Sequence, residues 1–160
     1  MQPVERTALK CPECGAALAT ERRCEEYLHD LLALEWQIAG APGGEPHLFA
    51  VGTYNLQHPS GFLPAALVEL CRTLADVLAG RASVDDARQR ARRADGDDTI
   101  LSDEERQLLK QWPTRWTTTV RDVCDAPADE YARNVRTWAL STVEALSRVV
   151  NGAQDAVRDR

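Results

Sequence analysis

The stretch "CEEYLHDLLALEWQIAGAPGGEPHLFAVGTYNLQHPSG", residues 24–61, predicts two helices joined by a turn. In its first half, apolar side chains recur every three or four residues between Tyr27 and Ile38, with acidic side chains opposite. This spacing is typical of an amphipathic helix that buries one face. The Gly- and Pro-rich segment 40–46 ends the helix and predicts a loop.

The second half, "HLFAVGTYNLQHP", is ambiguous by composition, because Phe, Val, Thr and Tyr also suit a strand. The spacing favours a helix, since side chains that are four, three and four residues apart share one helical face: His47, Val51, Tyr54 and His58. This helix is expected to end at His58, because the residue before a proline avoids the α region.

The rest of the chain also predicts helices. A helix is predicted from about Gly61 to Leu78, followed by a charged helix that is capped by Ser83 and a turn at Asp95-Gly96. A capping box of Ser102 and Glu105 then begins a short helix, which ends at Trp112-Pro113. The last helix is predicted from about Ala128. The segment "WTTTVRDV", residues 116–123, is the best strand candidate, with an extended connection before a helix as the alternative. We therefore expect a mainly α fold of one domain, residues 1–160, in which an irregular segment 1–23 packs on a helical body 24–160, with at most a short strand element.

Two tryptophans and two cysteines are predicted to have structural roles. Trp36 and Trp138 lie on apolar helical faces, where a tryptophan more often packs than binds a ligand. Cys71 and Cys124 follow apolar neighbours and are expected to be buried.

The composition narrows the possible partners. At 160 residues the chain suits one domain that buries about two-thirds of its unfolded surface. A net charge of −6 and a pI near 5.1 argue against binding to nucleic acid or to an anionic membrane. The opening "MQPVERTALKCPECG" lacks the apolar region of an export signal, and no apolar run approaches the roughly 20 residues of a membrane span, so we expect a cytoplasmic protein. A small molecule or a protein is left as the partner, and the oligomeric state stays open.

The N-terminal segment contains a pair of cysteines with metal-ligand spacing. In a reducing compartment, the five cysteines of the chain are read first as metal ligands, redox thiols or buried side chains. Cys11-Pro-Glu-Cys14-Gly is a zinc-knuckle sequence, because two thiolates three positions apart can hold one ion and Gly15 allows the positive φ that the turn needs. The alternative, a redox dithiol, is disfavoured because it usually opens a helix in a βαβ unit and none is predicted. The expected cofactor is Zn²⁺.

The third and fourth ligands are chosen by helix geometry. Cys24, ten residues beyond Cys14, is the third candidate, with a buried structural thiol as the alternative. On a helix, His29 would point about 140° away from Cys24 and is expected at the surface. The first helix carries the chain roughly 20 Å away from the metal and the second brings it back. His58 therefore returns to the metal while His47 lies at the far end, so His58 is preferred, although the choice between them stays open.

The segments "CPECG", "LLALE" and "YNLQHP" together resemble an uncharacterised bacterial family whose members share a Cys-Pro-x-Cys-Gly opening and a Tyr-x-Leu-Gln-His-Pro motif. The late segment "VRTWALSTVEAL" is similar to that family's C-terminal helix, so the resemblance covers most of the chain. It implies a shared fold and a shared site but no reaction, because the family has no established activity. Gly52 stands where the family's pattern would have an acidic residue, so no carboxylate is expected to act near Tyr54.

Two functions fit these residues. In the first, the protein is a small soluble protein of unknown molecular function that binds a structural zinc. Three thiolates and one imidazole complete the coordination of this zinc, and they belong to Cys11, Cys14, Cys24 and His58. In the second, zinc keeps an open position and the protein is a small zinc-dependent enzyme that acts on a small molecule near His58. Its candidate catalytic residues are Tyr54, Gln57 and His47, of which Tyr54 and Gln57 are also read as structural. The first function is preferred, and enzymatic activity is left undecided.

Overall fold

The computed structural model describes residues 9–19, 21–40, 43–93 and 101–158, with side chains as far as Gly152. Its elements in chain order are β1 (Leu9–Lys10), β2 (Ala17–Leu18), α1 (Cys24–Ala39), α2 (Glu45–Gln57), η1 (Pro59–Gly61), α3 (Pro64–Leu78), α4 (Val84–Arg93), α5 (Asp103–Gln111), α6 (Val120–Asp125), η2 (Ala128–Glu130) and α7 (Tyr131–Arg158). The prediction of a single, mainly α domain is confirmed. The predicted turn at Asp95-Gly96 lies outside the described residues.

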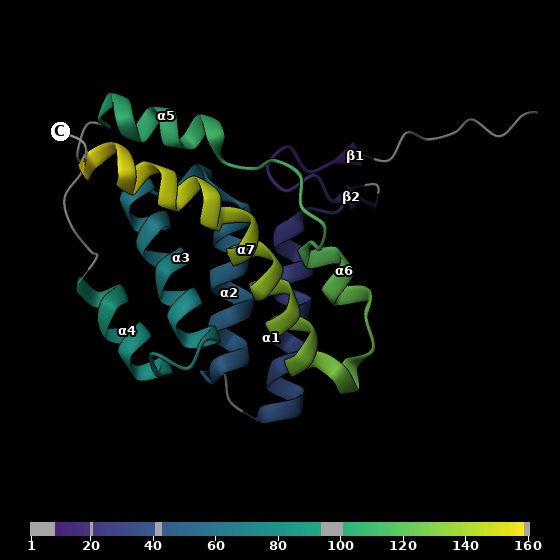
Figure 1. Ribbon diagram of the computed structural model, residues 1–160. Helices are drawn as coiled ribbons and strands as arrows, with labels where there is room; N and C mark the ends of the chain where they lie inside the picture. Colours follow the sequence, from purple (N-terminus) through teal and green to yellow (C-terminus); the bar gives the residue numbers. More distant parts are fainter. Residues whose placement is uncertain (1–8, 20, 41–42, 94–100, 159–160) are drawn as a thin grey trace, which may run out of the picture.

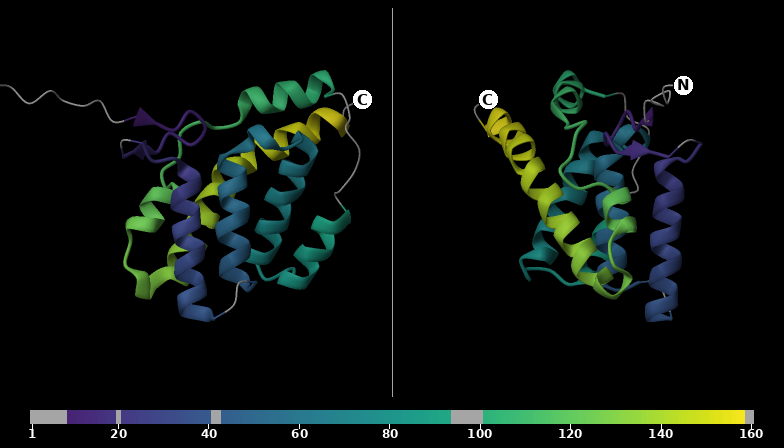
Figure 2. Two further views of the ribbon diagram at one scale, coloured as in Figure 1. Left: turned by 180° about the vertical axis from the view of Figure 1, so that it is seen from behind. Right: turned by 90° about the vertical axis from the view of Figure 1, so that its right-hand side faces the viewer.

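Three helices form the body of the protein. Helices α1, α2 and α3 lie side by side, each running opposite to its neighbour, and the long helix α7 crosses this layer diagonally (Figures 1 and 2). Helix α6 packs between α1 and α7, while α4 and α5 cover α3. The N-terminal strands β1 and β2 pair antiparallel beside the start of α1. No helix in the described part of the chain has both the length and the apolar character needed to cross a membrane.

The core lies between α7 and the three-helix layer. Trp138 on α7 is fully buried, as the helical spacing predicts, and it shares the core with Phe49 of α2 and Leu74 of α3. Helices α2 and α3 approach each other closely at Gly52, where a Cβ atom would lie 3.1 Å from both Cδ atoms of Leu74. In this chain, position 52 therefore faces an apolar side chain, which gives a packing reason for glycine there.

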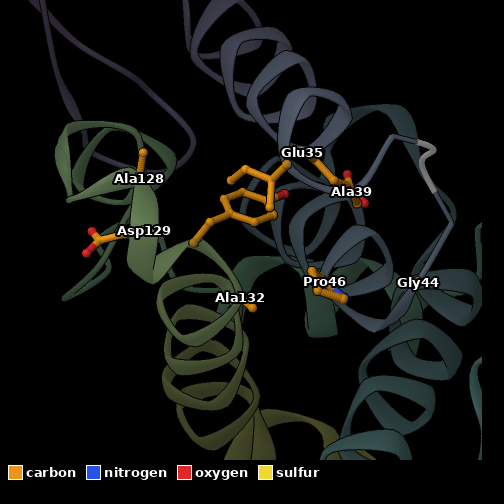
Figure 3. A pocket seen from close by; sticks show the side chains of 9 residues that line it. Glu35, Ala39, Gly44, Pro46, Ala128, Asp129 and Ala132 are labelled. Carbon is orange, nitrogen blue, oxygen red and sulfur yellow. The ribbon is translucent and has the colours of Figure 1, made fainter.

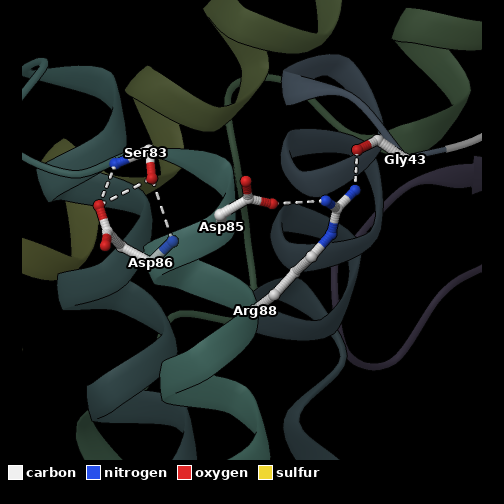
Figure 4. A network of polar contacts seen from close by, with 5 residues as sticks. All are labelled: Gly43, Ser83, Asp85, Asp86 and Arg88. Carbon is white, nitrogen blue, oxygen red and sulfur yellow. Dashed lines mark hydrogen bonds and ion pairs between the residues drawn. The ribbon is translucent and has the colours of Figure 1, made fainter.

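Helix α4 is tied to the turn between α1 and α2 by a polar network (Figure 4). Ser83 and Asp86 cap the helix, since the Asp86 amide donates to Ser83 Oγ at 3.1 Å and the Ser83 amide donates to Asp86 Oδ2 at 2.8 Å. Arg88 donates to Asp85 at 2.8 Å and to the carbonyl oxygen of Gly43, just before α2. The predicted cap at Ser83 is confirmed.

The prediction of a strand over residues 116–123 is wrong. These residues form a connection followed by the first turn of α6, which begins at Val120. Thr119 caps this helix, because its amide and its hydroxyl both donate to Asp122 Oδ2, at 2.7 and 2.9 Å. A connection before a helix, the alternative to a strand, is observed, with extended backbone at Thr119. Capping chemistry, which is local and directional, here outweighs the strand propensity of three threonines.

Two further predictions about side-chain burial need correction. Trp36 is 58% exposed on the outer face of α1, because the buried face of this helix continues from Leu31 to Glu35 and Trp36 lies outside it. Cys124 is half-buried rather than buried, whereas Cys71 is buried as predicted.

Candidate metal centre

Four side chains from separate parts of the chain meet at one end of the helical layer. They are Cys11 and Cys14 from the segment between β1 and β2, Cys24 from the first turn of α1, and His58 from the end of α2. All four are buried, and their ligand atoms lie within 4.8 Å of one another. The cluster could therefore hold one metal ion.

The distances within the cluster suit a tetrahedral metal. Cys11 Sγ lies 3.6 Å from His58 Nε2, and Cys14 Sγ lies 3.6 Å from Cys24 Sγ. Zinc bonds of about 2.3 Å to sulfur and about 2.0–2.1 Å to nitrogen place tetrahedral ligands about 3.8 Å (S to S) and about 3.6 Å (S to N) apart. Both observed separations are thus close to the edges of a zinc tetrahedron, so this donor set fits zinc.

The cysteine pair is shaped by a tight turn. The Gly15 amide donates to the Cys11 carbonyl at 2.9 Å, and the Cys11 amide donates to the Ala16 carbonyl at 2.9 Å. Gly15 has φ +75°, and a Cβ atom there would lie 3.1 Å from the Thr114 carbonyl oxygen. Glycine is therefore required twice, by its left-handed backbone and by the close approach of residue 114.

The turn is attached to the end of α2. Glu13, between the two cysteines, accepts a hydrogen bond from the Ser60 amide at 2.9 Å. Ser60 belongs to η1, directly after His58. This contact holds the cysteine pair against the histidine across 47 residues of sequence.

Cys24 is positioned by the start of α1. It is the first residue of the helix, and Arg23 before it is the cap, whose amide donates to Glu26 Oε2 at 2.7 Å. The positive end of a helix dipole favours a thiolate over a thiol at this position. Cys24 can therefore supply a charged sulfur ligand.

The orientation of His58 leaves one ring nitrogen free for a metal. His58 Nδ1 lies 2.8 Å from the Tyr54 carbonyl oxygen, which can only accept, so Nδ1 carries the proton. In a neutral imidazole Nε2 then holds the lone pair, and Nε2 is the atom that faces Cys11. Ligating histidines are commonly fixed in this way through their other nitrogen.

The electrostatics of the cluster favour a thiolate at Cys14 and a protonated thiol at Cys24. The hydrogen bond with Cys24 is the main cause that lowers the pKa of Cys14, against the effect of burial, and His58 adds to it. The same hydrogen bond and burial raise the pKa of Cys24. Burial alone would lower the pKa of His58, but its bonds with Cys14 and Tyr54 outweigh burial and raise it. A bound cation would instead favour the charged form of every thiol at once.

The three candidate catalytic residues are placed differently. The Tyr54 ring stacks on His58, with ring centroids 4.0 Å apart and planes at 22°. Gln57 points into the core, where its Nε2 donates to the Thr118 carbonyl and to Thr142 Oγ1, both at 2.9 Å. His47 lies at the other end of α2, 2.8 Å from Glu35. Of the three, only Tyr54 touches the cluster.

A cavity of about 400 Å³ adjoins the cysteine side of the cluster. Its lining includes both Cys11 and Cys14, together with Arg115 and Trp116, but neither Cys24 nor His58. Among the described residues, the buried Trp116 Nε1 has no hydrogen-bond partner. Residues 114–116 were not predicted to lie beside the cluster, because about a hundred residues separate them from Cys11 and no local pattern links them.

The fold and the cluster define a class: a small, mainly α protein with a buried Cys3His group that could hold a metal. The sequence model of a family of unknown function (DUF5946) matches residues 9–147, which include the whole cluster. The chain belongs to this family. No curated protein and no solved structure matches the chain. The family assignment agrees with the resemblance in the sequence, while the bacterial origin and the shared motifs stay predictions.

Proposed function

We propose that this protein binds one zinc ion through Cys11, Cys14, Cys24 and His58, and that the ion has a structural role. The observation that carries the proposal is the convergence of four buried ligand atoms within 4.8 Å, of which the pairs Cys11–His58 and Cys14–Cys24 are separated by distances close to the edges of a zinc tetrahedron. Four protein ligands leave no position for water, which is the arrangement of structural zinc sites.

A structural role also agrees with what the site connects. The ligands come from the N-terminal turn, from the start of α1 and from the end of α2, so one ion would hold together both helices and the segment before them. The paired strands have only two residues each and cannot fix this segment alone. Zinc-binding free energy would then contribute directly to folding. A reducing compartment such as the cytoplasm would keep the thiols available.

A second candidate function, a small zinc-dependent enzyme, rests on the cavity beside Cys11 and Cys14. If one cysteine did not ligate, a small molecule in this cavity could reach the metal, which would act as a Lewis acid. Tyr54 would hold His58 by stacking, while Gln57 and His47 lie away from the cluster. Thiolate ligands donate charge to zinc and weaken it as a Lewis acid, so the structural role is preferred.

The test is metal content together with X-ray absorption at the zinc edge. We expect one zinc per chain with three sulfur ligands and one nitrogen ligand. In His58→Ala the nitrogen ligand should disappear and the melting temperature should fall. An absence of zinc, or a shell unchanged in His58→Ala, would overturn the proposed ligand set. An oxygen ligand in the wild type would favour the enzyme.

Matched controls exist on the same chain. His29→Ala removes an exposed imidazole from α1, whose side chain is 66% exposed, and should change neither the metal shell nor the melting temperature. Cys124→Ser removes a half-buried thiol outside the cluster and should retain full zinc content, whereas Cys24→Ser should not.

A further inference from the structure

A second cavity, of about 470 Å³, lies at the opposite end of the helical layer from the cysteine cluster. Glu35 and Ala39 reach it from α1, Gly44 and Pro46 from the start of α2, and the segment 128–132 closes the third side (Figure 3). Glu35 follows Cys24 by eleven residues on the same helix, which corresponds to about 16 Å. The cavity is therefore separate from the metal centre, and its size is typical of a small-molecule site.

A buried carboxylate lies in the wall of this cavity. The Glu35 side chain is only 4% exposed, and its Oε2 is 2.8 Å from His47 Nδ1. His47 is the one hydrogen-bond partner of this carboxylate among the described residues. This contact occupies Oε2 alone, and no described residue bonds to Oε1. A buried carboxylate with a single hydrogen-bond partner is poorly compensated. The carboxylate can therefore accept further hydrogen bonds from a donor inside the cavity.

A second polar group of the wall lacks a partner. Tyr131, at the start of α7, lines the cavity, and within the described part of the chain its buried hydroxyl has no hydrogen-bond partner. Buried hydroxyls without a partner are uncommon in proteins and need an explanation. Burial, and then the charge of Glu35, raise the pKa of Tyr131, so the hydroxyl keeps its proton and can both donate and accept.

The rest of the lining selects for a ligand with an apolar body. Apart from Glu35, Tyr131 and Gly44 it consists of Ile38, Ala39, Pro46, Ala128 and Ala132, with Asp129 as a second acidic residue. None of these nine described residues is a lysine or an arginine, so the two charged side chains that line the cavity, Glu35 and Asp129, are both acidic.

We propose that this cavity binds a small organic cation, such as a primary amine with an apolar body, through Glu35 and Tyr131. The ammonium group donates to the Glu35 carboxylate and to the Tyr131 hydroxyl, and the hydrocarbon part contacts the alanines and Ile38. Charge-assisted hydrogen bonds of this kind are stronger than neutral ones and give selectivity for the cation. The proposal is independent of the metal, because the two sites share no residue.

The test is a titration of the full-length, zinc-loaded protein with hexylamine, followed by the NMR shifts of the backbone amides of Gly44, Ala128 and Ala132. The matched ligands are 1-hexanol and hexanoate, which have the same chain length and differ in charge. We expect saturable shifts with hexylamine and an affinity roughly tenfold or more above that for either matched ligand.

Two variants localise the cation. Glu35→Gln keeps the shape and should weaken hexylamine binding about tenfold while leaving 1-hexanol unaffected. Tyr131→Phe removes a hydroxyl that has no partner among the described residues, so it should weaken hexylamine binding without lowering the melting temperature. Glu144→Gln makes the same charge change on an exposed face of α7 and should alter nothing.

The proposal is overturned if hexylamine causes no saturable shift into the millimolar range, or if the amine, the alcohol and the carboxylate bind equally well. It is also overturned if Tyr131→Phe binds hexylamine as tightly as the wild type does, and so behaves like the control Glu144→Gln. That last comparison holds even if Glu35→Gln fails to fold.

Discussion

Replacing Gly52 by alanine tests how closely α2 and α3 must approach. The added Cβ atom would lie 3.1 Å from both Cδ atoms of Leu74 and 3.4 Å from its Cγ. Leu74 is fully buried, so its side chain has little room to move. Carbon atoms in ordinary contact are about 3.5–4.0 Å apart, so Leu74 or one of the two helices must shift by a few tenths of an ångström.

Two opposing effects set the expected size. Alanine is about 1 kcal/mol more favourable than glycine inside a helix. Overpacking a well-packed core typically costs about 1–3 kcal/mol. The net expectation for Gly52→Ala is a loss of about 0–2 kcal/mol of unfolding free energy. Gly152→Ala is the matched control, because position 152 lies on α7 with no atom within 4 Å of the added Cβ. This control should be stabilised by about 0.5–1 kcal/mol.

Urea unfolding at a fixed free zinc concentration, followed by tryptophan fluorescence, measures both variants. With an m-value of about 1–3 kcal/mol/M, a change of about 1 kcal/mol moves the midpoint by roughly 0.3–1 M. The midpoint should rise for Gly152→Ala and should fall or stay unchanged for Gly52→Ala. If Gly52→Ala gains as much stability as Gly152→Ala, the close contact between α2 and α3 is not a constraint on this position and the reasoning is refuted.

Three further predictions concern the metal, one ion pair and one buried hydrogen bond. Chelating the proposed zinc should lower the unfolding free energy by about 4 kcal/mol, relative to protein at a free zinc concentration about 1,000 times its Kd. Adding zinc, but not magnesium, should restore the melting temperature. Asp76 is bonded mainly to Arg90, which lowers its pKa, so its contribution is present above the unfolded pKa of about 3.9 and is lost as the pH falls through the folded value. Asp76→Asn should therefore cost about 0.5–1 kcal/mol at pH 7, and calorimetry should show this difference vanish once the wild-type carboxyl is protonated. Trp112 Nε1 donates to the Leu56 carbonyl at 2.7 Å, near the end of α2, where carbonyl oxygens lack helical partners. Trp112→Phe should therefore lower the unfolding free energy in urea by about 1–3 kcal/mol. Trp36→Phe, on the exposed face of α1, should change it little.

The helices that carry the cluster were predictable because their signals are local. Periodic apolar residues defined α1, and His58 followed by Pro59 marked the end of α2. The helical rise then favoured His58 over His47 as the histidine that returns to the start of α1, without any knowledge of the contacts between the helices. Local spacing and fixed geometry were enough for His58 to join the three cysteines.

Other features depend on contacts that no local pattern encodes. The connection before α6 was assigned as a strand because its threonines suit one, while the cap formed by Thr119 and Asp122 has aspartate where the usual capping box has glutamate or glutamine. The second cavity combines Glu35 with Tyr131, 96 positions later, and only the crossing of α7 over the layer brings them together. Residues that meet through tertiary structure alone lie beyond what spacing along the chain can show.

The length of the helix pair α1 and α2 determines how far apart the two proposed sites lie. Each helix has at least thirteen residues, so the pair extends the chain about 20 Å away from the cluster and back. One end of the pair brings Cys24 and His58 together, and the other brings Glu35 to His47. His47 lies in the first turn of α2 and His58 is its C-cap, eleven residues later, which is about three helical turns, so the two histidines cannot reach one ion. The same regular helix that keeps His47 away from the metal ligands therefore places it beside the Glu35 carboxylate. One end of α2 thus contributes to the proposed metal site and the other to the cavity that contains Glu35.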